Sequence, residues 1–295
     1  MNKISRCQPL LGTYVEMHIT GDETDDVLLD MSIAAFNEIE KVHQLMSFQD
    51  TESELSFINR TAAQSTCTVS REIYEVLTQA IQLSEMTAGL FDITVAQQLV
   101  NKGLLPDHGV TVDASACWKD ILLMANQQVR FTKNLIIDLG GIAKGYAVDK
   151  AVAVLDGKVS ACVNAGGDLR MTHWQDESVC IRHPANPNQV LELSMQNAAV
   201  ATSASYYLDG KDAIVKLDAA LGAPLNSALD KTQDEITANS SNSYSVFADK
   251  CMLADALTKI AFLSYQSEGC NHKAVFSQFN ASVVQVDPLG RITQH

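Results

Sequence analysis

Apolar residues recur along the chain with two periods, and each period predicts a different kind of element. In residues 27–46 the apolar side chains Phe36, Ile39, Val42 and Leu45 return every three residues, which is typical of a helix that packs one side against a core. The same helical spacing predicts further helices over residues 71–85, 146–155 and 249–263. These segments account for the long elements of the chain.

Short apolar runs bounded by turn-forming residues predict strands. The predicted strands are residues 135–137, 161–163, 179–182, 190–194 and 200–202, with a hairpin over residues 283–293. Residues 225–243 are rich in Asn, Ser, Asp and Thr and predict a long surface loop. Because helices and strands mix without strict alternation, the pattern predicts the α+β class.

Composition and charge narrow the class of protein. The chain has 295 residues, of which 46% are hydrophobic, so it can bury a large core. Its net charge of −14 argues against nucleic acid as a partner, because few basic groups are in surplus to neutralise phosphates. The sequence contains no run of eighteen apolar residues that would predict a membrane span, and its first residues do not resemble a signal peptide. The sequence as written therefore predicts a cytoplasmic protein. The seven cysteines include no C-x-x-C pair and predict reduced thiols buried as small hydrophobic residues.

Residues 137–149 predict a phosphate site. The glycine pair Gly140 and Gly141 lets backbone N–H groups approach a ligand, and the helix that follows presents its N-terminus to an anion. Lys144 adds a positive charge at this point. The alternative interpretation is a tight turn between a strand and a helix, with a solvated lysine.

Two further segments carry candidate chemistry. A predicted strand ends in Gly166, Gly167 and Asp168, which repeats the glycine-edged pattern. On the predicted helix 249–263, Thr258 and Lys259 lie three and four residues after Asp255 and therefore share its face. Oxygen ligands so placed suit Mg2+, whereas the alternative is an exposed ion pair between Asp255 and Lys259.

In order and spacing, these segments and several others resemble the ApbE family, the FAD:protein FMN transferases. The matching motifs are residues 11–13, 46–47 with 53–56 and 59, 89–92, 138–149, 164–168, 201–203 and 254–257, which together cover nearly the whole chain. The resemblance implies a single domain over residues 1–295, with a two-lobed mixed α/β fold and an FAD cleft between the lobes.

The resemblance also implies an activity, namely Mg2+-dependent transfer of FMN from FAD to a Thr or Ser hydroxyl of a partner protein, with release of AMP. It implies a metal held by Asp255, Thr258 and the carbonyl of Ala143. We expect the catalytic group to consist of Asp255, Thr258 and Lys259. The implied FAD-binding residues are Leu11, Leu90, Phe91, Asp92, Asp138, Gly140, Gly141, Lys144, Asp168, Thr202 and Ser203.

The sequence departs from the family pattern in three places. The family places its ligand threonine four residues after the aspartate, where this chain has Lys259, whose ammonium group can pair with Asp255 at the metal position. The family segment H-I-I-D-P-R-T-G is reduced to its aspartate and glycine in residues 215–222. The flavin-stacking aromatic is replaced by Gln49, with Phe48 beside it as a substitute.

These departures leave two alternative functions open. One is hydrolysis of FAD to FMN and AMP, and the other is FAD binding without catalysis. Members of the family are commonly exported or lipid-anchored, whereas this sequence shows no lipobox at Cys7. We therefore expect either a member that works inside the cell or a sequence whose start has been trimmed.

Overall fold

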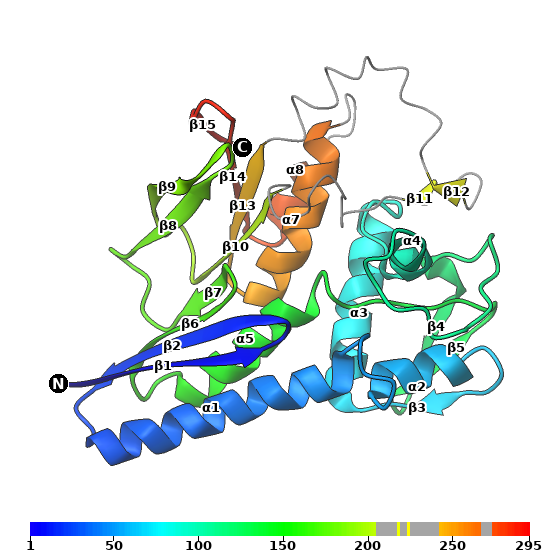
Figure 1. Cartoon of the computed structure of the whole chain (residues 1–295), viewed down its shortest axis with the longest axis horizontal. Helices are drawn as coiled ribbons and strands as arrows, with labels where there is room; N and C mark the ends of the chain where they lie inside the picture. The colour runs from blue at the N-terminus through cyan, green and yellow to red at the C-terminus, as the bar shows by residue number, and fades with distance from the viewer. Residues whose placement is uncertain (205–216, 219–222, 225–241, 267–272) are drawn as a thin grey trace. The chain divides into compact units, whose positions relative to one another are not determined.

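The computed structural model describes residues 1–204, 217–218, 223–224, 242–266 and 273–295. The chain divides into two compact units (Figure 1). The first unit comprises Met1–His43, Ile142–Tyr207 and Glu235–His295, and the second comprises Gln44–Gly141 and Leu208–Asp234. The single domain over residues 1–295 stays a prediction.

An antiparallel sheet of eight strands forms the centre of the first unit, in the order β1-β2-β6-β7-β10-β13-β14-β15. The strands are β1 (Asn2–Leu10), β2 (Thr13–Gly21), β6 (Ser160–Ala165), β7 (Asp168–Met171), β10 (Ala199–Ala204), β13 (Ser243–Ala248), β14 (Ser282–Val286) and β15 (Ile292–Gln294). Successive side chains of a strand point to opposite faces, so Val15, Met17 and Ile19 of β2 are buried while the residues between them are exposed.

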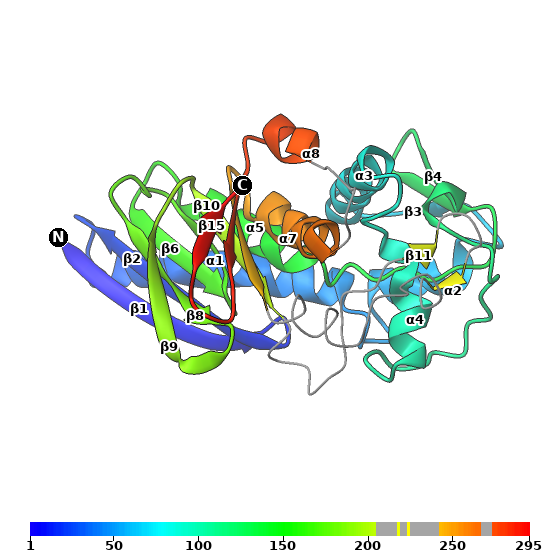
Figure 2. The ribbon, with the colours of Figure 1, turned by 90° about the horizontal axis from the view of Figure 1, so that it is seen from above.

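Both faces of this sheet are covered at its centre. Helices α5 (Ala143–Leu155) and α7 (Cys251–Gln266) pack on one face, with α5 against β6 and β7, and α7 against β10 and β13. A two-stranded sheet, β8 (Ser178–His183) with β9 (Asn186–Ser194), lies on the other side (Figure 2). It packs against a core cluster that includes Phe247 of β13. Strand β13 is therefore buried along its whole length.

The remaining elements of the first unit lie around this sandwich. Helix α1 (Asp25–Met46) follows β2 and runs into the start of the second unit, and α8 (Lys273–Gln278) precedes β14. The apolar spacing that predicted the first helix is confirmed, since Phe36, Ile39 and Val42 are all buried.

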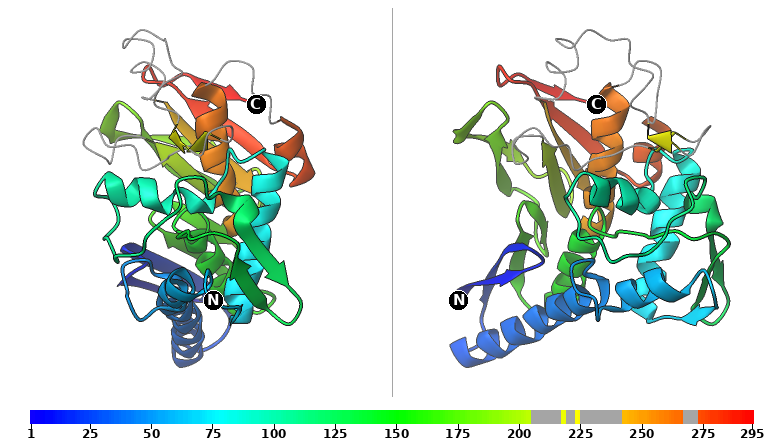
Figure 3. Two further views of the ribbon diagram at one scale, coloured as in Figure 1. Left: turned by 90° about the vertical axis from the view of Figure 1, so that its right-hand side faces the viewer. Right: turned by 45° about the vertical axis from the view of Figure 1, so that its right-hand side comes forward.

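The second unit combines short helices with small sheets (Figure 3). Its helices are α2 (Glu54–Thr61), α3 (Arg71–Met86), η1 (Ile93–Val95), α4 (Ala96–Asn101) and η2 (Trp118–Asp120). Strands β3 (Cys67–Thr68), β5 (Gln128–Phe131) and β4 (Ile121–Met124) form one antiparallel sheet in that order, and β11 (Leu217–Asp218) pairs with β12 (Ala223–Pro224). Ser53 and Ser70 cap α2 and α3 by accepting backbone N–H groups of the first turn.

The strand predicted over residues 135–137 is wrong. The segment is buried, with Ile137 fully so, but it joins no sheet. Instead, the side-chain amide of Asn59 pairs with both backbone groups of Ile137, donating to its carbonyl at 3.0 Å and accepting its N–H at 2.9 Å. One side chain thus replaces a neighbouring strand, because buried backbone groups require hydrogen-bond partners from any source.

The other predicted elements are confirmed where the structure describes them. The four predicted helices correspond to α1, α3, α5 and α7, the terminal hairpin to β14 and β15, and the remaining predicted strands to β6, β8, β9 and β10. Most of the predicted loop over residues 225–243, and all of residues 215–222 except 217 and 218, lie outside the described residues. Among the helices that the structure describes, none combines the length and apolar character needed to cross a membrane.

The cysteine prediction is correct for some thiols only. Cys67 and Cys251 are buried, Cys117 and Cys162 are half-buried, and Cys7 and Cys180 are exposed, while Cys270 lies outside the described residues. All six described thiols are free, which agrees with the predicted reduced state. Cys7 and Cys180 are exposed because they occupy outward positions of the alternating strands β1 and β8.

Candidate functional site

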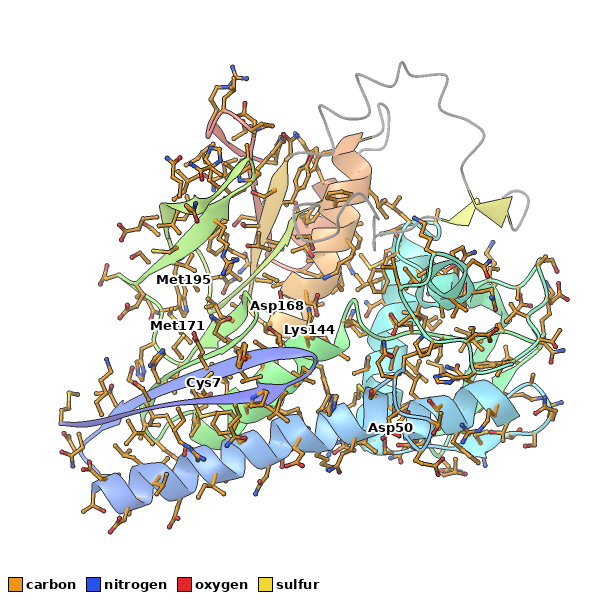
Figure 4. All side chains as sticks on the ribbon, in the orientation of Figure 1. Cys7, Asp50, Lys144, Asp168, Met171 and Met195 are labelled. Atoms are coloured by element: carbon orange, nitrogen blue, oxygen red, sulfur yellow. The ribbon has the colours of Figure 1, made fainter. Side chains whose placement is uncertain are left out.

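Four charged residues from three elements meet in the first unit. Lys144 is in the first turn of α5, Asp168 begins β7, and Asp255 and Lys259 lie one turn apart on α7. The Lys144 ammonium group donates to Asp168 Oδ2 and lies 3.7 Å from Asp255 Oδ2. Figure 4 shows Lys144 and Asp168 next to each other at the start of α5. We call these four residues the charged cluster.

The second lysine of the charged cluster occupies the other side of Asp255. Lys259 Nζ donates to Asp255 Oδ1 and also to the Asp255 carbonyl oxygen at 3.0 Å. The sequence-based alternative of an ion pair between these two residues is thus confirmed. The predicted exposed setting is wrong, however, because Asp255 is 0% exposed.

Gly145 explains how α5 and α7 come close enough to form the charged cluster. A Cβ atom at Gly145 would lie only 2.2 Å from the Cys251 carbonyl oxygen, so no other residue type fits between the two helices. The Gly145 N–H donates to Asp255 Oδ2 at 3.2 Å. The residue after Lys144 therefore fixes both the helix crossing and the carboxylate.

Asp149 is a positioning residue to which sequence reasoning gave no role beyond its place in a motif. Its two carboxylate oxygens accept the N–H groups of Cys251 and Met252, each at 2.9 Å, and Oδ1 also accepts from Arg170 Nη1 at 2.8 Å. An aspartate of α5 thus satisfies the free N–H groups at the start of α7. No local signal could have revealed this contact, because it joins residues about a hundred positions apart.

Burial and charge order the charged cluster from inside to outside. The Asp255 and Asp168 side chains are 0% and 5% exposed, whereas those of Lys144 and Lys259 are 32% and 20% exposed. Although burial favours a neutral carboxyl, the lysine charges outweigh it and lower the pKa of Asp255. Burial and the neighbouring Asp255 charge raise the pKa of Asp168. Burial acts to lower the pKa of Lys144, but the two carboxylates raise it above its usual value. The ammonium groups are therefore the accessible part of the cluster.

An open hollow of about 840 Å3 adjoins Lys144 within the first unit. Two hairpin turns form part of its wall, the Leu11–Gly12 turn between β1 and β2, and the Gly166–Gly167 turn between β6 and β7. All four turn residues have positive φ, which suits two-residue hairpins. Other wall residues come from β8 and from Thr202 of β10. The volume is within the range of small-molecule sites.

Two pairs of hydroxyl groups lie on opposite faces of β10, one beside the hollow and one beside the charged cluster. Thr202 Oγ1 lies 2.8 Å from Ser245 Oγ, and Ser203 Oγ lies 2.7 Å from Thr258 Oγ1. Thr258 donates to the Asp255 carbonyl at 2.7 Å and is fully buried. Of the predicted site residues, the structure thus brings Lys144, Asp168, Ser203, Asp255, Thr258 and Lys259 into one network, with Leu11 and Thr202 on the neighbouring wall.

The predicted metal ligands do not form an open Mg2+ site. Both carboxylate oxygens of Asp255 are engaged by N–H donors, Oδ1 by Lys259 and Oδ2 by Gly145. The Thr258 hydroxyl is bonded on both sides, and Ala143 is nearly buried at the start of α5. A divalent cation requires free oxygen ligands, and here ammonium groups stand where it would bind.

The predicted flavin contacts of the second unit lie inside that unit. Leu90, Phe91 and Asp92 are buried, and Asp92 Oδ1 accepts the N–H of Thr94 at 2.8 Å and its hydroxyl at 2.7 Å. Burial raises the pKa of Asp92 to about 6, although the hydrogen bonds to Thr94 oppose this effect. These contacts place Asp92 as the cap of η1.

The Asp138–Gly141 segment adjoins the same turn. The Asp138 N–H donates to the Ile93 carbonyl at 2.9 Å, and a Cβ at Gly140 would lie 3.0 Å from Asp138 Oδ2. Gly141 lies two residues before the first residue of α5, Ala143. Phe48, the predicted stacking substitute, is only 5% exposed, and its ring centroid lies 5.2 Å from that of His108. Phe48 is therefore a buried side chain of the second unit that packs against His108.

The fold and the order of these motifs define a family. The sequence profile of the ApbE family matches residues 11–277, which is most of the chain. The protein belongs to the ApbE family.

Named relatives agree with this assignment. The FAD:protein FMN transferase of Treponema pallidum is 23% identical over 92% of this chain and 81% of its own length, and that of Vibrio cholerae is 27% identical over 74% and 69%. Two solved structures share the fold. The ApbE protein of Thermotoga maritima has a TM-score of 0.77 at 24% identity, covering 99% of this chain and 97% of its own. The flavin transferase ApbE of Vibrio cholerae has a TM-score of 0.76 at 22% identity, covering 100% and 96%.

Proposed function

We propose that the protein binds FAD and transfers its FMN part to a Thr or Ser hydroxyl of a partner protein, releasing AMP. The observation that carries this proposal is the charged cluster, in which the accessible ammonium group of Lys144 adjoins an open hollow of small-molecule size. Family membership and the names of the relatives support the choice of flavin chemistry. The proposal uses residues of the first unit only.

In the proposed reaction, the acceptor hydroxyl oxygen forms a bond to the phosphorus atom of the FMN part. The bond between that phosphorus and the oxygen bridging to AMP breaks, and AMP leaves with the proton that the hydroxyl gave up. Such phosphoryl transfers depend on positioning and on neutralising charge. The ammonium group of Lys144 neutralises charge on the diphosphate, and Asp168 and Asp255 hold this ammonium group in place.

The wall of the hollow supplies further proposed contacts to FAD. Backbone groups of the Leu11–Gly12 and Gly166–Gly167 turns are accessible because both turns are hairpin tips and three of their four residues are glycines. Thr202 and Ser203 provide hydroxyl groups on the neighbouring strand β10.

The test is to incubate the protein with FAD and a total protein extract of the source cells, with Mg2+ in one series and EDTA in another. Transfer predicts flavin fluorescence on protein bands after denaturing electrophoresis, together with an equal amount of AMP. Lys144→Met should remove both products, because it removes the ammonium group that contacts Asp168. The matched control is Lys158→Met, which removes an exposed lysine whose Nζ donates to the Val154 carbonyl.

A second candidate function is FAD binding without transfer. The contact between Lys259 and Asp255 favours it, because the metal position expected from the family is taken by an ammonium group. This candidate predicts bound FAD that stays intact, with no AMP in either series. AMP without labelled protein would instead indicate hydrolysis of FAD by water.

A further inference from the structure

We infer that the Lys259 ammonium group replaces a divalent cation, so that the charged cluster binds the diphosphate of the flavin nucleotide without a metal. This inference rests on the proposed function only in that FAD is taken as the ligand. It concerns how the diphosphate is held and applies equally to a transferase and to a binding protein.

Both carboxylate oxygens of Asp255 already have hydrogen-bond partners. A carboxylate can hold a metal only through oxygen atoms that are free to coordinate. Oδ1 accepts from Lys259, and Oδ2 accepts from the Gly145 N–H at 3.2 Å and lies 3.7 Å from Lys144 Nζ. The carboxylate thus lies between two ammonium groups.

The oxygen atoms next to this carboxylate are also engaged in hydrogen bonds. The Asp255 carbonyl accepts from Lys259 Nζ at 3.0 Å and from the Thr258 hydroxyl at 2.7 Å, and it lies within the backbone hydrogen-bond ladder of α7. Because Thr258 gives its proton to that carbonyl, it must accept the proton of Ser203. The Thr258 hydroxyl, one of the predicted metal ligands, is thus engaged in hydrogen bonds within the protein.

The net charge of the charged cluster also disfavours a divalent cation. Two lysines and two aspartates sum to zero, and a divalent cation added beside two ammonium groups would be repelled. If Lys259 were a threonine, the same residues would carry one net negative charge and would attract such a cation. The identity of residue 259 therefore decides which kind of charge the cluster accepts.

The lysine side chains of the charged cluster are more accessible to a ligand than its aspartates. The lysine side chains are 32% and 20% exposed, while the aspartates beneath them are 0% and 5% exposed. An incoming anion meets the ammonium groups first, and the buried carboxylates keep these groups in fixed positions. Held donors of this kind bind a diphosphate through charge-assisted hydrogen bonds.

The experiment measures FAD affinity by titration calorimetry in EDTA and in millimolar MgCl2. For the unmodified protein we expect the two dissociation constants to agree within about twofold, because Mg2+ and FAD binding are not coupled. Electron paramagnetic resonance of Mn2+ mixed with the protein alone should show only free Mn2+. Both measurements use the intact chain and neither requires turnover.

Variants of residue 259 sharpen the test. Lys259→Thr should lower FAD affinity about ten- to a hundredfold in EDTA, since one charged contact is lost, and Mg2+ should restore it. Lys259→Arg keeps the charge and should stay independent of metal. Lys158→Met is the control for loss of a lysine, because Lys158 also donates to the carbonyl four residues earlier but lies outside the charged cluster.

The outcomes separate the inference from the proposed function. If the unmodified protein binds FAD more than about tenfold tighter with Mg2+, or binds Mn2+ by itself, the inference is overturned while flavin binding stands. If FAD binds in neither buffer, the proposed function fails and the inference fails with it. Equal affinity in the two buffers supports the inference even if Lys259→Thr does not fold.

Discussion

Single side chains hold the candidate site together across long stretches of sequence. Asp149 lies on α5 but accepts the first two N–H groups of α7, and one turn further along α7 stands Asp255. Arg170 of β7 bonds the same carboxylate at 2.8 Å. One buried acid thus ties together the three elements that carry the charged cluster.

Replacing Asp149 should therefore lower stability strongly. Asp149→Ala leaves Arg170 and two buried N–H groups without their partner, and we expect a loss of about 3 kcal/mol in the free energy of unfolding. Urea denaturation followed by circular dichroism measures it. Asp22→Ala is the control, because the Asp22 side chain is 90% exposed and its removal should change the value by less than about 0.5 kcal/mol. Equal losses in the two variants would contradict the role of Asp149.

Asp92 predicts a pH dependence of stability in the second unit. Burial raises the pKa of Asp92 from 3.8 to about 6, so the folded protein holds the proton more tightly than the unfolded chain. The resulting stabilisation is complete below pH 3.8 and is lost as the pH rises through 6. Relative to Asp92→Asn, which stays neutral, the unmodified protein should lose about 3 kcal/mol between pH 4 and pH 7.

Denaturant unfolding of both proteins across this pH range tests the prediction. The difference between their free energies of unfolding should change with pH, with its midpoint between the two pKa values. Parallel pH curves for the two proteins would show that burial does not raise the pKa of this carboxyl.

At the scale of elements, two hairpin turns are held against each other beside the hollow. Gly166 has φ of 65°, and a Cβ there would lie 2.5 Å from Thr13 Oγ1, on the first residue of β2. The turn thus needs glycine for two separate reasons, its backbone conformation and the close approach of Thr13. Gly157, which follows α5, has a similar φ of 71° but open space around it.

This pair of glycines separates the two effects. Gly157→Ala should cost about 1 kcal/mol from the left-handed backbone alone, and Gly166→Ala should cost about 1–3 kcal/mol more because of the clash. Adding Thr13→Ala to Gly166→Ala removes the clashing Oγ1 atom and should recover most of the extra loss. Thermal unfolding of the four proteins provides the comparison, and no recovery in the double variant would rule out the clash as the cause.

At the scale of the whole molecule, the main sheet joins segments from both ends of the chain. Strand β2 pairs with β6, and β10 pairs with β13, which in turn pairs with β14. These pairings place Lys144, Asp168 and Asp255 in one cluster although more than a hundred residues separate the first from the last. A ligand of the cluster should therefore stabilise the first unit, to which all these segments belong.

FAD should raise the unfolding temperature in a buffer that contains EDTA. A ligand that binds only the folded state adds about 2.7 kcal/mol at a hundred times its dissociation constant. Differential scanning fluorimetry that follows tryptophan emission measures the shift in unfolding temperature. Riboflavin is the control, because it lacks the diphosphate and should give a much smaller shift. Equal shifts with the two ligands would show that the diphosphate does not carry the binding.

Much of this architecture could be predicted from the sequence, for reasons visible in particular segments. The helices α1, α3, α5 and α7 followed from apolar spacing, because a helix at the edge of a core must turn one face inward. The strand predicted over residues 135–137 was wrong, because an apolar run indicates burial but not which group forms hydrogen bonds with its backbone. Asn59 is distant in sequence, so no local pattern contains this information.

The amino-acid sequence by itself determined the kinds of element, the glycine-edged turns and the presence of Lys144, Asp168 and Asp255 in recognisable motifs. These features depend on residue type and local spacing. The tertiary structure alone decided that Asp149 of α5 accepts the first N–H groups of α7 and that Asp255 is fully buried beneath two ammonium groups. Such outcomes depend on which distant groups come within hydrogen-bonding distance, and the strength and accessibility of each contact follow from burial, which only the packed chain defines.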